Sequence, residues 1–167
     1  GAQRFGHDCA NLNAAAAWFE GARKPRARSM RSFTLSAARA WLFNQVLFER
    51  VRARSWQHCL VGEWAARNED GSLAPTGPMA GRGHSRCVGL VSAIEAEVMR
   101  EYPGWVAGLE RAGLRIERRR LISEPLDFRW HHDASRGELR LQFGLRRGEF
   151  ATALLAQCVD TEIGLDQ

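Results

Sequence analysis

The feature that most constrains the fold is a long segment, from about Ser32 to Arg54, with apolar residues at helical spacing on two sides. One stripe holds Leu35, Ala38, Trp41, Leu42 and Val46, and the second holds Phe33, Ala37, Ala40, Leu47 and Val51. This spacing predicts an α-helix, and apolar residues on two sides predict that most of it is buried. Its polar residues then need partners, because an unpaired polar group in a core costs about 1–3 kcal/mol. They are Ser36, Arg39, Asn44 and Gln45.

The remaining elements are predicted from periodicity and turn residues. A loop is expected over Gly1–Asn13, and a turn-rich loop from Trp56 to Gly89, where glycine and proline are concentrated over 62–89. Helices are expected over Leu12–Glu20, Val88–Tyr102, Trp105–Ala112 and within Gly148–Val159, and strands over Arg118–Ile122, Asp127–His132 and Glu138–Phe143. The pattern indicates an α/β or α+β fold with its strands late in the chain.

Composition excludes several classes of protein. Of the 167 residues, 45% are hydrophobic and 26% are charged, as in an ordinary globular domain. No apolar run approaches the roughly 18–20 residues of a membrane span and the N-terminus lacks a signal-peptide pattern, so we expect a soluble, cytoplasmic protein without a membrane partner. The four cysteines are too dispersed for a zinc cluster or an implied disulfide framework, which fits a reducing compartment. Composition leaves the oligomeric state open, with a monomer as the expectation.

Positive charge points to a class of partner. The formal net charge is +5, and all but Lys24 of the 24 basic side chains are arginine. Guanidinium groups bind phosphate in a bidentate manner and stack on bases, which favours a nucleic acid, although codon usage in a GC-rich genome explains the preference over lysine equally well. One basic run, with no acidic residue between Glu20 and Glu49, comprises Arg23, Lys24, Arg26, Arg28 and Arg31. It is interpreted either as a phosphate-binding patch or as a solvated connector.

Three local patterns carry no catalytic assignment. The Gly81–His84 loop matches neither a Walker-type phosphate loop nor a dinucleotide fingerprint. The run His131-His132-Asp133 is interpreted as a strand end, because neighbouring strand residues point to opposite faces and do not easily share one metal ion. The serines lack the G-x-S-x-G elbow of hydrolases.

A set of segments in a fixed order is more informative than these local patterns. They read GAQRFG at 1–6, RSFTLSAAR at 31–39 followed by FNQ at 43–45, TGPMAGRG at 76–83, ERR at 117–119, LRLQF at 139–143 and GEFAT at 148–152. In this order they resemble the motifs of the TruD-type tRNA pseudouridine synthases, over nearly all of the chain apart from about 61–73. The chain departs from the family at Arg146 or Arg147, where proline is usual, and at Gln157, where an acidic residue is common.

The resemblance implies a fold and an activity. The implied fold is α/β (α+β), with a family-specific insertion domain over 1–120, including a long buried helix, and a segment over 121–167 that returns to the catalytic sheet. The implied activity is isomerisation of uridine to pseudouridine in tRNA by one carboxylate nucleophile, without cofactor or metal. The family's G-x-K-D-[RK]-x-A-x-T and G-N-x-F motifs are not in this sequence. We therefore expect no catalytic residue in the chain, which alone should be inactive and should form a wall of the RNA cleft.

The resemblance also implies site residues. Phe150 is the expected stacking ring for the extruded uridine, against the alternative of a core ring at a strand–helix corner. Arg4 and Phe5 are expected to line the same cleft, against the alternative that they anchor a loop. The basic run from Arg23 to Arg31 is expected to contact phosphates. Two other functions stay open: a noncatalytic RNA-binding module of the same family, and a globular interaction domain whose arginines reflect codon usage.

Overall fold

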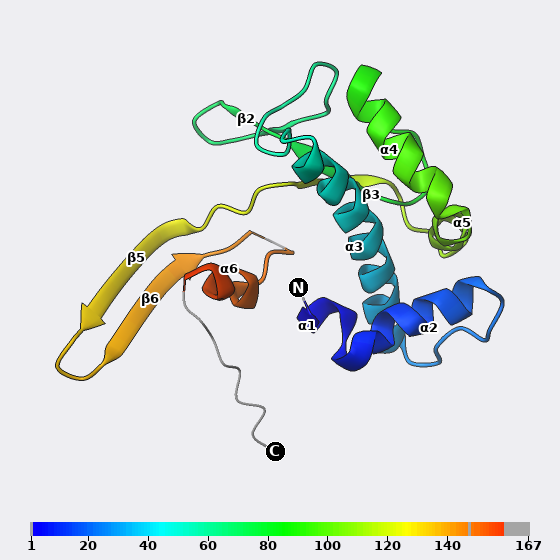
Figure 1. Ribbon diagram of the computed structural model, residues 1–167. Helices are drawn as coiled ribbons and strands as arrows, with labels where there is room; N and C mark the ends of the chain where they lie inside the picture. Colours follow the sequence, from blue (N-terminus) through cyan, green and yellow to red (C-terminus); the bar gives the residue numbers. More distant parts are fainter. Residues whose placement is uncertain (1, 147, 159–167) are drawn as a thin grey trace. The chain divides into compact units, whose positions relative to one another are not determined.

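The computed structural model describes residues 2–146 and 148–158, in two units. The N-terminal unit, Ala2–Ile122, contains most of the elements in Figure 1. They are α1 (Ala2–Phe5), η1 (His7–Cys9), α2 (Ala10–Phe19), α3 (Arg28–Arg52), β1 (Ala66–Arg67), β2 (Leu73–Ala74), β3 (Thr76–Met79), α4 (Gly89–Glu101), α5 (Pro103–Arg111) and β4 (Glu117–Arg120). The C-terminal unit, described over 123–146 and 148–158, contains β5 (Leu126–Asp133), β6 (Glu138–Gly144) and α6 (Ala151–Cys158).

The sheets of the described residues are small and antiparallel: β1 pairs with β2, β3 with β4, and β5 with β6. Each unit combines helices with small antiparallel sheets. The α+β form of the predicted fold class is therefore confirmed.

Helix α3 organises the N-terminal unit. It contacts α1, α2, α4, α5 and β3 (Figure 1). Ala38 and Leu42 on α3 are fully buried in a core that also holds Ala15, Ala80 and Leu109. A second, smaller cluster contains Phe43, Met79 and Leu121. The predicted long helix is thus confirmed and is buried through its middle.

The second apolar stripe of α3 is only partly covered. Ala37 and Ala40 are buried, but Phe33 is 57% and Val51 46% exposed. The expectation of burial on two sides is therefore wrong at both ends of this stripe. The helix extends beyond the elements that cover its middle, and a 3.6-residue period by itself does not reveal where such cover ends.

The predicted loop over Gly1–Asn13 is wrong, because α1, η1 and the start of α2 lie there. The chain turns at Gly6, whose φ of 80° is one that residues with a Cβ seldom adopt. The turn is held by Asn11, whose Nδ2 donates to the Arg4 carbonyl at 3.1 Å. Such short helical turns, set by one glycine and one side chain, leave no periodic pattern.

The prediction of one unpacked loop from Trp56 to Gly89, with strands only late in the chain, is also wrong. Three strands lie in it, and every residue of 74–81 is buried. The reason is pairing over a long sequence distance: Thr76 pairs with Arg120, and Met79 with Glu117. Gly81 permits the backbone to pass close to Arg115, since a Cβ at position 81 would lie 2.7 Å from the Arg115 backbone. Local turn signals do not report such pairing.

Strands β5 and β6 form an amphipathic hairpin in the C-terminal unit (Figure 1). Trp130 lies opposite Leu141, and the rings of Phe128 and Phe143 stack with centroids 6.0 Å apart. Successive strand residues alternate between faces, so these side chains share one face. Trp130 is nevertheless 68% exposed. The described residues of this unit therefore leave an apolar sheet face uncovered.

Candidate functional site

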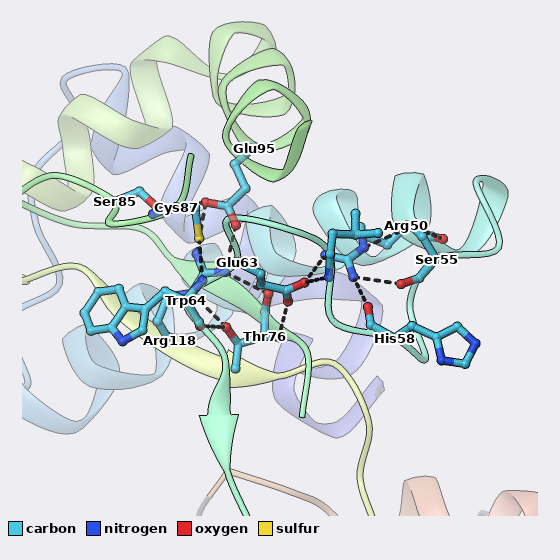
Figure 2. A network of polar contacts seen from close by, with 11 residues as sticks. Arg50, Ser55, His58, Glu63, Trp64, Thr76, Ser85, Cys87, Glu95 and Arg118 are labelled. Carbon is cyan, nitrogen blue, oxygen red and sulfur yellow. Dashed lines mark hydrogen bonds and ion pairs between the residues drawn. The ribbon is translucent and has the colours of Figure 1, made fainter. Parts of the chain in front are cut away.

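A buried polar network ties the turn-rich segment to α3 (Figure 2). The side chains of Arg50 and Glu63 are 1% and 0% exposed, and Arg50 Nη1 donates to Glu63 Oε2 at 3.1 Å. Arg50 also donates through Nη2 to the carbonyls of Ser55 and His58 at 2.7 and 2.8 Å. Glu63 Oε1 accepts the backbone N–H of Thr76 at 2.7 Å. One ion pair thus fixes the ends of the segment between α3 and β3.

The network continues to α4 through a second arginine. Arg118 Nε donates to Thr76 Oγ1 at 3.0 Å, and its Nη1 donates to Glu95 Oε2 at 2.9 Å (Figure 2). The side chains of Arg118 and Glu95 are 8% and 7% exposed. Buried carboxylates paired in this way are held by the guanidinium groups facing them. We therefore interpret the network as the frame of the unit rather than as a reaction centre.

The family-like motifs converge on a separate cluster of arginines, named here the arginine cluster: Arg4, Arg39 and Arg119. Arg4 Nη1 donates to Ser36 Oγ at 2.5 Å. Arg39, one turn further along α3, donates through Nη2 to the carbonyls of Met79 and Arg115 at 2.9 and 2.8 Å. Arg119, on β4, lies with its guanidinium carbon 5.3 Å from the centre of the Phe43 ring.

Electrostatics of the arginine cluster favour an anion. Burial, together with the charges of Arg4 and Arg39, lowers the pKa of Arg119 to about 10, although Glu117 opposes this shift. Glu117 is 3.2 Å from Arg39 Nη1 and balances one of the three positive charges. Like charges brought together in a partly desolvated place are stabilised by a bound anion. A phosphate group would supply that charge.

Arg4 and Phe5 lie on α1 and not on a loop. Phe5 is half-buried, with its ring edge-on to that of Trp41 at 6.3 Å between centroids. Arg4 is held by a side-chain hydroxyl of α3, and burial lowers its pKa. The two residues anchor α1 on α3, and Arg4 also belongs to the arginine cluster. Their place in an RNA cleft stays a prediction.

The basic run spans the connector between α2 and α3 and the first turn of α3. Arg23, Lys24, Arg26 and Arg28 are exposed and Arg31 is half-buried. Within the described part of the chain, none of these five side chains forms an ion pair. Their charge is therefore not neutralised locally, as both sequence interpretations require.

Phe150 lies in the C-terminal unit, directly before α6. Its carbonyl accepts the N–H groups of Ala153 and Leu154 at 3.0 and 3.3 Å, which begins the helix. Its side chain is half-buried. Half-burial is compatible with a stacking ring and with a corner residue, so the role of Phe150 stays a prediction.

Asp133, which follows His131 and His132 in the sequence, has a structural role. Asp133, at the end of β5, accepts the Ser135 hydroxyl at 2.6 Å and its N–H at 3.0 Å, and the hydroxyl lowers the pKa of the carboxyl group. Asp133 thereby closes the hairpin turn. Among the described residues, no group of His, Cys, Asp and Glu side chains has the arrangement of a metal site.

Sequence reasoning missed Arg39 and Arg119 as site residues. Arg39 stood out only as a polar residue on an apolar helix, and its acceptors lie 40 and 76 residues away. Arg119 appeared only as part of an arginine-rich strand. The signal that could have found both was their place inside family-like motifs, at 31–39 and 117–119.

The chain is similar in sequence to known proteins that share one name. No family model matches the chain. It is 39% identical to tRNA pseudouridine synthase D of Nitrosococcus oceani over 100% of this chain and 52% of that protein. It is 34% identical to the Hydrogenovibrio crunogenus protein of the same name, over 98% of this chain and 52% of the relative. The chain thus spans about half the length of the curated relatives it matches.

A solved structure shares the fold of the chain. A crystal structure of a Methanosarcina mazei protein assigned to tRNA pseudouridine synthase D (TruD) superposes with a TM-score of 0.53 at 19% identity, over 93% of this chain and 45% of that one. The sequence identities place the chain among the tRNA pseudouridine synthases. Within that class it belongs to the tRNA pseudouridine synthase D family, as the C-terminal portion that its motifs predicted.

The structure bears on membranes in one respect. Among the helices of the described residues, none combines the length and the apolarity that a membrane crossing requires.

Proposed function

We propose that this chain is part of an enzyme that isomerises uridine to pseudouridine in tRNA. The observation that carries the proposal is the 39% identity to a tRNA pseudouridine synthase D over 100% of the chain. The reaction breaks the glycosidic bond, turns the base and joins ribose C1′ to C5, with a carboxylate as nucleophile. A uridine in folded RNA must first be extruded, which requires phosphate contacts and a stacking ring. A cytoplasmic location goes with this substrate.

The role proposed for this chain is to form one wall of the RNA cleft. The arginine cluster and the basic run offer positive charge for backbone phosphates, and Phe150 offers a ring for the extruded base. In this proposal residues 1–120 are the insertion domain and residues 121–167 return to the catalytic sheet. The uncovered apolar face of the β5–β6 hairpin supports the second part, because an isolated two-stranded hairpin is marginally stable and gains by packing.

The 167-residue chain by itself should make no pseudouridine. No aspartate in it lies in the G-x-K-D-[RK] setting that carries the family's nucleophile, and the buried Glu63 and Glu95 are paired with arginine. Tritium release from C5-labelled uridine in tRNA measures the reaction. The control is the gene's complete product, which should be active. Release by the chain alone would show that a carboxylate within it is the nucleophile, and binding without release by the complete product would favour a noncatalytic RNA-binding module.

The basic run should contribute to tRNA binding without sequence preference. Removing a single phosphate contact flattens the plot of log affinity against log salt concentration by about 0.7–0.9. Replacing Arg23, Arg26 and Arg28 with glutamine should therefore reduce the slope by about 2–3 units, with similar reductions in affinity for different tRNA sequences. Fluorescence anisotropy at several salt concentrations measures it. An unchanged slope would identify the run as a solvated connector.

A further inference from the structure

A pocket of about 420 Å³ lies beside the basic run, outside both the arginine cluster and the buried network. Its walls come from the end of α2, the connector to α3, the first turns of α3 and the end of α5. Its volume is within the range of roughly 300–1,000 Å³ that is usual for small-molecule sites. The pocket lies wholly within the N-terminal unit, so its walls have defined relative positions.

Two of the residues that line the pocket, Trp18 and Phe19, are aromatic. Trp18 is half-buried, and its ring lies 5.9 Å from that of Phe19 at a tilt of 34°. Phe19 is fixed from behind, since Trp105 packs edge-on against it at 6.0 Å and a Cβ at Gly108 would come within 2.3 Å of its ring. The absence of a side chain at Gly108 thus lets α5 approach α2 closely. The result is a supported aromatic surface of the kind on which bases stack.

The lining of the pocket is also cationic: it includes Lys24, Arg31 and Arg111 and no acidic residue. Arg111 is oriented by a hydrogen bond from Nη2 to the Phe19 carbonyl at 3.4 Å. Within the described residues, Lys24 and Arg31 form no ion pair. Glu110, next to Arg111 on α5, lines a different pocket.

The start of α3 adds positive charge beside the pocket. Its N-cap residue, Ala27, provides no side-chain cap, and the first turn contains no acidic residue. Arg28 and Arg31 occupy the turn instead. Helix N-termini carry a partial positive charge and favour anions, so cations in this turn are unfavourable until an anion binds. Three cations, an uncapped helix start and a supported aromatic wall together match the phosphate and the base of one nucleotide.

We propose that this pocket binds a single unpaired nucleotide of an RNA strand, with its base against Trp18 and its phosphate on Lys24, Arg31 and Arg111. The site rests on the proposed RNA-binding function and adds a second place where RNA is held, apart from the extruded uridine. A bare anion would use the cations and leave the aromatic wall unused. A base with its phosphate uses both.

The test compares two pairs of substitutions with the same loss of charge. Lys24→Gln with Arg31→Gln removes two pocket cations, and Arg52→Gln with Arg100→Gln removes two exposed cations that belong neither to the pocket nor to the basic run. Binding of a fluorescent oligouridylate to the 167-residue chain is measured by anisotropy at 0.1 M salt. The pocket pair should weaken binding about 10- to 100-fold and the control pair less than about 5-fold, since hydrogen bonds to charged groups add to the charge itself.

A third variant tests the contact between Trp18 and the base. Trp18→Leu should weaken oligouridylate binding roughly 5- to 150-fold, as expected when a stacking ring is removed, and should leave binding of inorganic polyphosphate within about 2-fold. Thermal midpoints establish that each variant is folded. The two pairs replace exposed or half-exposed side chains, so they decide the matter even if Trp18→Leu does not fold.

The outcomes separate this site from the proposed function. If the chain binds oligouridylate and both pairs weaken it equally, the pocket is not a nucleotide site although RNA binding stands. If uridine monophosphate alone binds as tightly as oligouridylate, the ligand is a free nucleotide and the assignment to an RNA strand is overturned. If neither the chain nor the complete protein binds RNA, both proposals fail.

Discussion

Replacing Arg50 with methionine should lower the free energy of unfolding by about 3–5 kcal/mol, because it leaves the carboxylate of Glu63 buried without its countercharge. That carboxylate is 0% exposed, and Arg50 is 1% exposed. The change also removes the donor to the carbonyls of Ser55 and His58. Urea unfolding followed by circular dichroism measures the destabilisation.

A matched control lies on the same helix. Arg52 pairs with Glu49 one turn away at 3.0 Å, and its side chain is 66% exposed. Arg52→Met should cost less than about 0.5 kcal/mol, as exposed pairs of this spacing do. Adding Glu63→Leu to Arg50→Met should recover part of the stability, since no buried charge then remains unpaired. Equal destabilisation by Arg50→Met and Arg52→Met would mean that the network is solvated and does not frame the unit.

Replacing Phe150 with leucine in the gene's complete product should lower kcat/KM roughly 5- to 150-fold, which corresponds to about 1–3 kcal/mol of transition-state stabilisation from a stacking ring. The melting temperature should change little. Phe150→Tyr should be nearly silent, because the π-face is kept and the hydroxyl group can reach solvent from a half-buried position. Both variants are assayed by tritium release and by thermal unfolding.

The opposite pattern would identify a core residue. A buried ring has no partner for a new hydroxyl group, so Phe150→Tyr would then lower the melting temperature, whereas Phe150→Leu would keep normal activity. That pattern would remove Phe150 from the proposed cleft. It would leave the proposed activity intact, because the identity to tRNA pseudouridine synthase D extends over the whole chain.

Elements with their own periodicity could be predicted from the sequence. Helices α4 and α5, divided at Pro103, and strand β6 lie within one or two residues of their predicted bounds. Helix α3 begins four residues earlier than predicted, at Arg28 in place of Ser32. The start carried no signal, since Ala27 provides no side-chain cap and helix starts are recognised mainly by such caps.

Features formed by distant segments could not be predicted. Strand β3 is set by pairing with β4, and Arg39 finds its acceptors on two other segments. The arginine cluster arises where three segments of the chain meet, so its residues looked like unrelated charges. Motif order supplied the family, but the positions of Lys24, Arg31 and Arg111 around one pocket depend on how α2, α3 and α5 pack.

The buried ion pairs have a consequence for handling the protein. At 1 M salt the screening length falls to about 3 Å, which suppresses interactions between exposed cations and phosphates, whereas desolvated pairs such as Arg50 with Glu63 and Arg118 with Glu95 are screened much less. A wash at that concentration should therefore strip co-purifying nucleic acid from the arginine-rich surface without loosening the fold. The proposed RNA contacts use exposed charges and should be lost at this salt concentration, whereas the ion pairs that hold the fold are buried and should persist.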